Sequence, residues 1–513
     1  MNTIHRILQT YFRPLLRQIE ASGQAFEASQ QRTFRMLMQH VAETQFGKEH
    51  SLTKDTTYET FRRNVPVREY NDIQPYIDRL RAGEDYVLWD ERVHWFAKSS
   101  GTSSDRSKFI PITSHNLKHC HYRGFQAMVA TYLRNNPDSK MFLGKSLTLG
   151  GSVTPNPLTE TGKTQSFSGD LSAILLKNSP APIEITRTPG RATALIGNFE
   201  EKIARICKEC SQQNVTNFAG VPSWNLILLN QVMEYNHANN LLDIWPNLEL
   251  FMHGGTHFEP YREQFRRLIP SDRMHYVENY NASEGYFAFQ DEFGDPGMRL
   301  ALDNGVFYEF IPQDKVEAVL QGDLSHVLPL EAVVTGQSYA LVISTDSGLW
   351  RYLIGDCVRF VNTHPHKLII TGRTQLFINL FGEELMIGNT EKALSQTCQT
   401  TGAVVSEYSV APMPLDKQGK GGHEWVVEFE QLPEDEDLEA FAGQLDQALC
   451  EQNSDYEAKR KGTMNALKLT CVPKGTFYRW MEQRGKTGGQ NKVPRLFPER
   501  KFVEALKEVA SQL

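Results

Sequence analysis

The segment from Ser99 to Lys108 combines residue types that are suited to holding phosphate groups. It reads SSGTSSDRSK, so hydroxyl groups, backbone N–H groups and a lysine crowd into one turn. Such donors can wrap around phosphate oxygens while the lysine offsets the negative charge of the ligand. A solvated Ser/Thr linker is the alternative, but the flanking runs VHWFA and FIPIT are apolar and predict two buried strands. We therefore interpret the segment as a phosphate-binding loop.

A Walker-type P-loop is excluded. Gly-Lys-Ser or Gly-Lys-Thr occurs at Gly144, Gly162 and Gly485, but the glycine required five residues earlier is absent each time. The sequence also lacks the G-x-S-x-G turn of serine hydrolases and the H-E-x-x-H helix of zinc proteases. These absences argue against P-loop NTPases and against both classes of hydrolase.

Two further segments carry an acid near an expected strand. In Tyr280–Gly285 (YNASEG), Glu284 follows a hydroxyl residue, and such a pair can hold Mg²⁺ and a phosphate oxygen together. In Trp350–Asp356 (WRYLIGD), the acid follows a glycine, a place from which a carboxylate can bind the vicinal hydroxyls of ribose. Taken singly, the first fits a turn with a surface glutamate equally well, and the second fits a β-turn.

Other polar clusters point less clearly to a ligand. His119 and His121 flank Cys120, but residues two apart on a helix face different ways, so we do not expect a metal site there. Cys207 and Cys210 form a C-x-x-C without the second pair that a zinc finger needs. The seven cysteines form an odd, scattered set, which is typical of a reducing compartment.

Composition describes an ordinary globular chain. It has 513 residues, of which 40% are hydrophobic, and a formal net charge of −7. This length predicts two or three domains, and the acidic balance argues against a general nucleic-acid or anionic-membrane binder. No apolar run approaches the ~18 residues of a membrane-spanning helix. We expect a cytoplasmic protein with small-molecule partners, without nucleic acid or membrane.

The spacing of apolar residues predicts the helices and strands that position these motifs. Helical patterns between residues 4 and 49, and strand-like runs at Lys145, Val215 and Leu248 between helical stretches, predict α/β layering. Residues 305–361 are β-dense, with GVFYEFIP, LEAVVTG, YALVIST and YLIGDCVRFV as expected strands in a small barrel or distorted sheet.

The tail has a different pattern. A helix from about Glu383, two strands, a helix near Leu438 and a final strand predict a compact α+β unit. The predicted fold is therefore α/β, with a large N-terminal domain over residues 1–375 that contains β-sheets and a small β-barrel-like part. A smaller, mobile α+β C-terminal domain follows over residues 376–513, with a hinge near residues 375–379.

In their order and distance, the three motifs resemble those of the adenylate-forming superfamily. More closely, the chain is similar to the Gretchen Hagen family of acyl-acid amido synthetases, and to its bacterial members in particular. That family has a Ser-Ser-Gly-Thr-Ser loop ending in Lys, a Tyr-x-x-Ser-Glu segment and an Arg-Tyr-x-x-Gly-Asp segment. Similarity continues through HGGTHFEPY, ITGRTQLFINLFGEE and QNKVPR, so it covers most of the chain.

The resemblance implies an ATP-dependent ligase. A small carboxylic acid would react with ATP to give an acyl-adenylate and pyrophosphate, and an amino acid amine would then displace AMP to form an amide. ATP and Mg²⁺ are the implied cofactors, and the protein is expected to be a monomer. The resemblance implies catalytic roles for Lys108, Glu284 and Lys492, with Glu284 as the metal ligand. It implies nucleotide contacts from Ser99, Ser100, Gly101, Thr102, Ser103, Gly254, Gly255, Tyr280, Asn281, Ser283, Asp356 and Arg373.

The sequence departs from the family at three places. Asp105 stands where the loop often has a second glycine, Leu353 stands where many relatives carry Arg, and the surroundings of Asn379 lack a hinge lysine. Two alternatives stay open. One is an acyl-CoA ligase that forms a thioester, since acceptor specificity depends on pocket shape, and the other is a non-catalytic nucleotide-binding relative, supported by Asp105 and Leu353.

Overall fold

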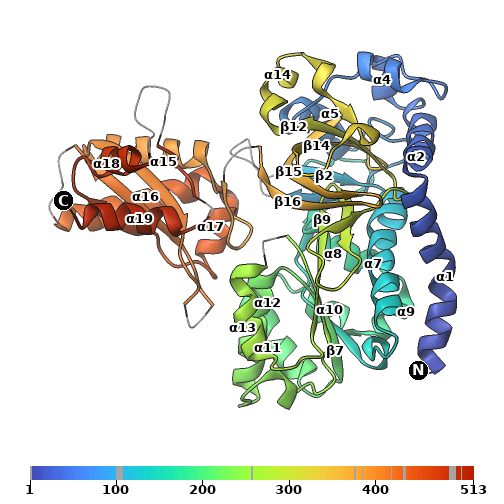
Figure 1. Cartoon of the computed structure of the whole chain (residues 1–513), viewed down its shortest axis with the longest axis horizontal. Coiled ribbons are helices and arrows are strands. Elements are labelled where there is room, and N and C mark those ends of the chain that lie inside the picture. Colours follow the sequence, from blue (N-terminus) through green and yellow to red (C-terminus); the bar gives the residue numbers. More distant parts are fainter. Residues whose placement is uncertain are drawn as a thin grey trace. The chain divides into compact units, whose positions relative to one another are not determined.

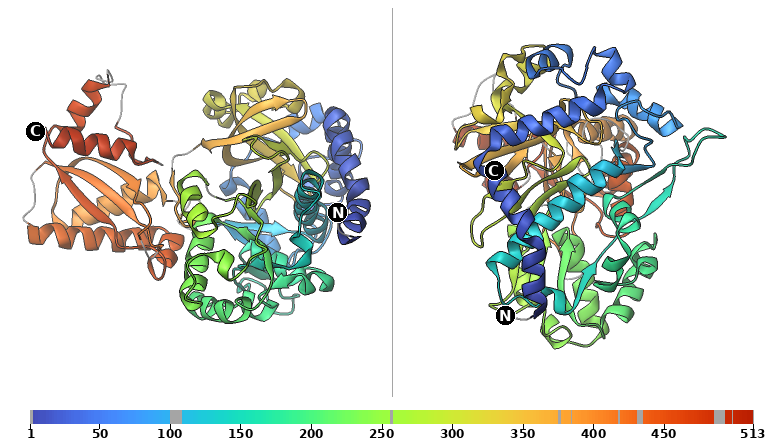
Figure 2. Two further views of the ribbon diagram at one scale, coloured as in Figure 1. Left: turned by 60° about the horizontal axis from the view of Figure 1, so that its bottom comes forward. Right: turned by 90° about the vertical axis from the view of Figure 1, so that its right-hand side faces the viewer.

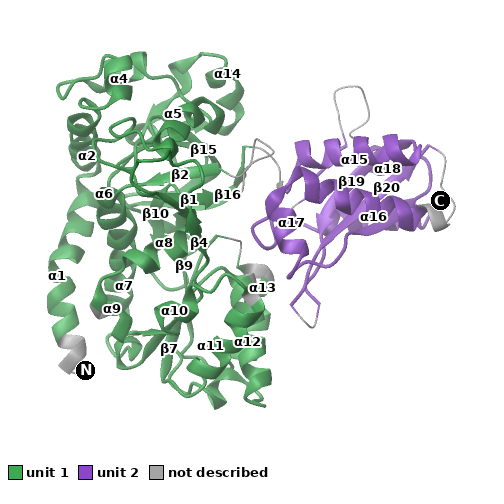
Figure 3. Cartoon of the chain, turned by 180° about the vertical axis from the view of Figure 1, so that it is seen from behind, with its two compact units in different colours: residues 1–99, 108–374 green, residues 100–107, 375–513 purple. Residues whose placement is uncertain are grey.

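The computed structural model describes residues 3–99, 108–255, 258–374, 377–383, 385–416, 419–430, 435–484, 493–497 and 499–512. The chain divides into two compact units, the first formed by residues 1–99 and 108–374 and the second containing residues 375–513 (Figure 3). None of the helices in the described ranges is both long enough and apolar enough to cross a bilayer.

A twelve-stranded mixed sheet forms the centre of the first unit. Its strand order is β13-β12-β14-β15-β16-β11-β10-β9-β8-β7-β3-β6. From β13 to β9 neighbouring strands are antiparallel, and from β9 to β6 they are parallel. The strands are β3 (Lys145–Thr148), β6 (Arg187–Thr188), β7 (Val215–Gly220), β8 (Leu250–His253), β9 (His275–Ala282), β10 (Gly285–Gln290), β11 (Met298–Leu300), β12 (Val306–Pro312), β13 (Leu328–Pro329), β14 (Ser338–Thr345), β15 (Tyr352–Thr363) and β16 (His366–Arg373).

A second, four-stranded sheet positions the predicted phosphate loop. Its order is β2-β1-β5-β4, with β1 at Trp95–Ser99, β2 at Lys108–Ile112, β4 at Val153–Pro155 and β5 at Phe167–Gly169. The strands expected from VHWFA and FIPIT are therefore confirmed. Ser99 and Lys108 are opposite each other in the β1–β2 register, so the predicted loop starts and ends at one place.

Helices surround both sheets (Figures 1 and 2). In the first unit they are α1 (Thr3–Gln24), α2 (Phe26–Val41), α3 (Gln45–Glu49), α4 (Tyr58–Asn64), α5 (Tyr70–Ala82), α6 (Ser114–Asn116), α7 (Tyr122–Asn135), α8 (Leu171–Asn178), α9 (Ala181–Ile185), α10 (Arg191–Ala194), α11 (Phe199–Cys210), α12 (Pro222–Tyr235), α13 (Glu259–Leu268) and α14 (Val316–Leu320). The amphipathic helices expected before residue 50 are confirmed, and α1 lies along α7.

The parallel strands end at a common edge. Gly220 of β7 pairs with His253 of β8, and His253 pairs with Glu278 of β9. Gly254 follows directly, and a Cβ there would lie 2.4 Å from the carbonyl oxygen of Asn279, so only glycine fits. Ligands of open α/β sheets bind at this carboxyl edge.

The second unit is an α+β layer, as expected. Its sheet has the order β19 (Val405–Pro412), β20 (His423–Phe429), β21 (Lys468–Val472), and a short pair joins β17 (Phe377–Ile378) to β18 (Leu385–Met386). Helices α15 (Ile387–Thr401), α16 (Asp435–Gln452), α17 (Ser454–Arg460), α18 (Thr476–Gln483) and α19 (Lys501–Ala510) complete it.

Two expected elements differ in the structure. The helix predicted from about Glu383 begins at Ile387, because Glu383 is buried and accepts hydrogen bonds from the backbone N–H groups of Leu380 and Phe381 in a preceding turn. The strand predicted from LEAVVTG is wrong. That segment begins as a 3₁₀ turn at Leu330–Ala332 directly after β13, Val334 is 52% exposed, and no strand in the described part of the chain pairs with it.

Candidate active site

Lys108 enters the site from the first residue of β2. Its side chain is buried, and its ammonium group lies 3.5 Å from the hydroxyl of Tyr352 and 5.6 Å from the ring centre of Tyr70. The Tyr70 hydroxyl accepts a hydrogen bond of 2.7 Å from the backbone N–H of Phe109, which fixes the start of β2 against α5. The charge of Lys108 is thus held at the end of the predicted loop.

Glu284 lies in the turn between β9 and β10 and is 6% exposed. Burial raises the pKa of the Glu284 carboxyl above its usual range, and the Lys108 ammonium group opposes that rise only in part. Glu284 also acts on Tyr70 and Tyr352, since its charge helps burial to raise the pKa of both hydroxyls. Lys108, Glu284 and these two tyrosines therefore share one polar pocket within the apolar core.

Asp356, on β15, links β9 to β16 through its side-chain partners Tyr280 and Arg373. Its carboxylate accepts a 2.5 Å hydrogen bond from the Tyr280 hydroxyl through Oδ2 and a 2.5 Å ion pair from Arg373 through Oδ1. Arg373 is opposite Asp356 in the β15–β16 register. Burial, followed by the Asp356 charge, raises the pKa of Tyr280 far above its usual value, so the hydroxyl remains a donor. The charges of Asp356 and Arg373 also act on the Glu284 carboxyl, since Asp356 raises its pKa and Arg373 lowers it.

A bulge in β15 aims Asp356 into this group. On β14, Ala340 and Val342 are two residues apart, whereas their partners Cys357 and Leu353 are four apart. Gly355 lies inside the extra stretch with φ +95°, a conformation that side chains disfavour. Asp356 therefore lies within a strand, and the predicted β-turn alternative is wrong.

Arg351, from the same motif as Asp356, has a structural role. Arg351 is fully buried at φ +47°, and its guanidinium binds both carboxylate oxygens of Glu309 at 2.9 and 3.0 Å. It also donates to the carbonyl oxygens of Arg62 and Val65. Arg351 therefore ties α4 to β12 and lies outside the polar pocket.

The structure thus brings together five of the residues singled out by sequence: Lys108, Tyr280, Glu284, Asp356 and Arg373. Ser99 pairs with Lys108, and Ser283 precedes Glu284 in its turn. Gly254 and Gly255 lie at the carboxyl edge of the sheet, Gly254 beside Asn279 and Gly255 beside Val221. The Asn281 side chain contacts His121 instead of this group. Ser100, Gly101, Thr102, Ser103 and Lys492 lie outside the described residues.

The family departures are partly explained. Leu353 is buried in an apolar cluster with Val67, Ile311 and Val342, so it fills the core beside β14. The Asn379 side chain accepts a 2.6 Å hydrogen bond from the backbone N–H of Gly382 and shapes the turn before β18. Asp105 lies outside the described residues.

The described residues fit a magnesium ion that arrives with a nucleotide. Among them, no group of three or more His, Cys, Asp or Glu could hold a metal alone. Magnesium usually binds one or two carboxylates together with substrate phosphates. Glu284 offers one such carboxylate, and burial penalises its charge, so a cation beside it would be favourable.

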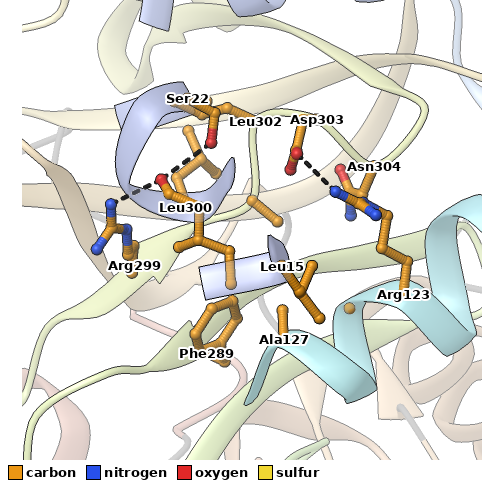
Figure 4. Close-up of a pocket in the computed structure, with 13 residues that line it drawn as sticks. Leu15, Ser22, Arg123, Ala127, Phe289, Arg299, Leu300, Leu302, Asp303 and Asn304 are labelled. Atoms are coloured by element: carbon orange, nitrogen blue, oxygen red, sulfur yellow. Dashed lines mark hydrogen bonds and ion pairs between the residues drawn. The ribbon is translucent and has the colours of Figure 1, made fainter. Parts of the chain in front are cut away.

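A separate hollow beneath α1 has no such chemistry (Figure 4). It is lined by residues of α1, α7 and the β10–β11 segment, among them Leu15, Ala127 and Phe289. Its charged groups are paired, with Arg123 and Asp303 2.8 Å apart. We assign it no ligand.

Comparison with known proteins identifies the family of the chain. The GH3 family N-terminal domain matches residues 15–274, the central domain residues 299–373 and the C-terminal domain residues 388–501. The chain belongs to the GH3 family. The resemblance to the Gretchen Hagen family is therefore confirmed, as is the mixed α/β fold with a separate C-terminal unit.

GH3 relatives at low identity cover most of the chain. Indole-3-acetic acid-amido synthetase GH3.10 of Arabidopsis thaliana is 24% identical, over 88% of this chain and 88% of its own. Jasmonoyl–L-amino acid synthetase JAR6 of Nicotiana attenuata is 22% identical, over 91% and 90%. Among solved structures, the GH3.15 acyl acid amido synthetase shares the fold with a TM-score of 0.60 at 17% identity, over 98% of this chain and 96% of that one.

We expect Arg351→Met to destabilise the GH3 protein strongly. Removing one partner of a buried ion pair leaves the Glu309 carboxylate with only its hydrogen bond from Tyr58, at a cost of about 3–5 kcal/mol. Urea unfolding followed by circular dichroism measures this. Arg359→Met, at an exposed position of β15, serves as the control and should change stability by less than about 0.5 kcal/mol. Equal stability of the two variants would contradict the assigned role.

Glu284→Gln should have the opposite effect on stability. Because the folded protein holds the pKa of Glu284 above its usual value, ionisation of this buried carboxyl destabilises wild type at pH values above that pKa. The variant should melt at a higher temperature there, and its advantage should shrink as pH falls through the raised pKa and wild type becomes protonated. Calorimetry between pH 7 and 4 tests this, with exposed Glu160→Gln as control. If the melting-temperature advantage of Glu284→Gln over wild type grew as the pH fell, the raised pKa of Glu284 would not explain it.

Proposed function

We propose that this protein is an ATP-dependent acyl-acid amido synthetase. It adenylates a small carboxylic acid, releases pyrophosphate, and transfers the acyl group to the amine of an amino acid with release of AMP. The observation that carries this proposal is the single buried group formed by Lys108, Glu284 and the Asp356–Arg373 pair, in a chain of the GH3 family.

Adenylation has to bring a carboxylate up to the α-phosphorus of ATP. The acid forms an O–P bond there while the bond to pyrophosphate breaks. Lys108 supplies a fixed positive charge in a water-poor pocket, where it opposes repulsion between the two anions. Glu284 would hold Mg²⁺, which, when bound, neutralises phosphate charge. Ser99 to Ser103 would donate to phosphate oxygens.

Asp356 is suited to binding the ribose. Each oxygen already accepts one hydrogen bond, from Tyr280 or Arg373, and keeps a second lone pair for a ribose hydroxyl. Because these partners also fix the carboxylate, it needs no reorganisation on binding. The ring of Tyr280 would lie against adenine, with Gly254 and Gly255 letting the nucleotide pass close to the backbone.

The second step uses the adenylate as an acyl donor. The amino acid amine forms a C–N bond to the acyl carbon, the bond to AMP breaks, and the amine loses a proton. We place the division between a large domain at residues 1–375 and a smaller mobile one at residues 376–513. Lys492, from the smaller domain, would enter the site for adenylation.

The working form is proposed to be a cytoplasmic monomer. All seven cysteines lie in the described residues and none forms a disulfide there, which agrees with a reducing compartment. Light scattering at micromolar concentration checks the monomer.

Pyrophosphate exchange tests the proposed reaction. Purified protein with ATP, Mg²⁺ and labelled pyrophosphate should exchange label only when benzoate, indole-3-acetate, butanoate or another acid of a panel is present. Lys108→Met should lower that exchange about a hundredfold or more, because one transition-state donor is lost. Exposed Lys54→Met is the control and should exchange normally. Absence of exchange with every acid favours a non-catalytic nucleotide binder.

The chemical nature of the product shows whether the acyl group is transferred to an amine or to a thiol. With the best acid, mass spectrometry after incubation with the amino acids, or with coenzyme A, should find an amide. A thioester without any amide identifies an acyl-CoA ligase and overturns the proposal.

Lys492→Ala should separate adenylation from later steps. We expect pyrophosphate exchange to fall at least tenfold while ATP binding, measured by calorimetry, stays within about twofold, since Lys492 is assigned to the transition state and not to ground-state binding. Transfer from preformed acyl-adenylate should persist. Unchanged exchange in the variant would rule out the role of Lys492.

A further inference from the structure

Asn281 follows Tyr280 on β9, but its side chain lies on the other face of the sheet, because side chains alternate along a strand. Tyr280 contacts Asp356, on the face that the proposed nucleotide uses. Asn281 is opposite Tyr286 of β10, against the π-helical turn Leu117–His121 that precedes α7. The side chains of Tyr280 and Asn281 therefore have different surroundings, Tyr280 contacting Asp356 and Asn281 contacting His121.

His121 holds the Asn281 amide in one orientation. Its Nδ1 lies 3.2 Å from Oδ1 of Asn281. Burial lowers the pKa of His121 to about 4, so the ring is neutral near pH 7. An amide oxygen only accepts hydrogen bonds, so Nδ1 must carry the proton and donate it. The Asn281 amide nitrogen is then directed away from His121.

The hydrogen bond from His121 to Asn281 carries a free-energy cost, because it leaves the other ring nitrogen of His121 without a partner. His121 is 2% exposed, and its Nε2 is buried without a hydrogen-bond partner in the described structure. An unpartnered buried acceptor is unfavourable, and an apolar ring would fill the space without that cost. Packing alone therefore does not account for histidine here, whereas orientation of Asn281 does.

The Asn281 amide nitrogen is suited to a carboxylate. Asn281 is only half-buried, and its Nδ2 has no partner among the described residues. It lies at the carboxyl edge of the parallel strands, three residues before Glu284. A neutral donor binds an anionic carboxylate and still accommodates the neutral acyl carbonyl formed on adenylation, which a second lysine would not do equally well.

We propose that Asn281 binds the carboxylate of the acid substrate through Nδ2, and that His121 is the positioning residue that orients this amide. The proposal rests on the proposed function for the identity of the ligand. It gives Asn281 a contact with the acid near the end of β9, while Tyr280 and Asp356 are left to the nucleotide.

Equilibrium binding tests the contact. With purified full-length protein and a non-hydrolysable ATP analogue, the Kd of benzoate, indole-3-acetate and butanoate is measured by calorimetry. Asn281→Ala should raise the Kd of the bound acid about tenfold, since a hydrogen bond to a charged group is lost. Asn281→Asp should raise it more than a hundredfold, because it places a like charge there. The Kd of the ATP analogue should stay within about twofold in both variants.

Variants of His121 test the positioning role. His121→Phe should raise the acid Kd about three- to tenfold, but should have no further effect when combined with Asn281→Ala. His121→Gln keeps an N–H for Asn281 and should restore most of the affinity. His119→Phe, in the same turn, is the matched control and should bind the acid as wild type does. Melting temperatures show which variants are folded.

The outcomes separate this inference from the proposed function. Acid affinity that depends on Asn281 and His121, without pyrophosphate exchange, keeps the contact and ends the ligase proposal. Exchange in wild type, with acid affinity unchanged in folded Asn281→Ala, ends the contact and keeps the ligase. Additive effects of His121→Phe and Asn281→Ala, or a loss of ATP-analogue binding, show a structural role and overturn the inference. If none of the acids binds to wild type, both fail.

Discussion

The carboxylate of Asp356 connects the two halves of the central sheet. Tyr280, which reaches it, lies on β9, where the parallel strands meet the antiparallel ones, whereas Arg373 reaches it from β16. Both hydrogen bonds are charge-assisted, which makes them short and directional, and the bond from Tyr280 is also buried. They set the spacing between the turn that carries Glu284 and the strand that carries Asp356, so the geometry of the whole candidate site depends on this carboxylate.

The same group carries a cost in stability. Glu284 is buried with its pKa raised, and Lys108 offsets that burial only in part. A core designed for stability alone would replace both with apolar side chains. Their retention among Tyr70 and Tyr352 is understandable if a polyanion and a cation complete the charge balance. Such local conflicts with packing rules are expected at functional sites and are compensated elsewhere.

Much of this was predictable from the sequence. The apolar runs on either side of Ser99–Lys108 predicted β1 and β2, and the family resemblance implied that Lys108, Glu284 and Asp356 all serve one nucleotide site. Tyr70, Tyr352 and His121 were missed, because their roles depend on which elements pack side by side, and spacing along one chain does not contain that information. The bulge that aims Asp356 had one visible signal, Gly355, which fits a turn equally well. The strand predicted from LEAVVTG was wrong because β-branched residues favour strands only where a partner strand is available.

Arg351 and Asp356 show how one short motif can serve two purposes. They are five residues apart, yet Arg351 fixes α4 on β12 through Glu309 and Asp356 faces the candidate site. Arg351 adopts a left-handed conformation directly before β15, and Gly355 adopts another within it. The first lies in the connection from β14 to β15, and the second lies in the bulge that shifts the alternation of side chains along β15. Without both, Tyr352 would not reach Lys108 while Asp356 reaches Tyr280. The motif therefore encodes a backbone path, and the ligand contact follows from that path.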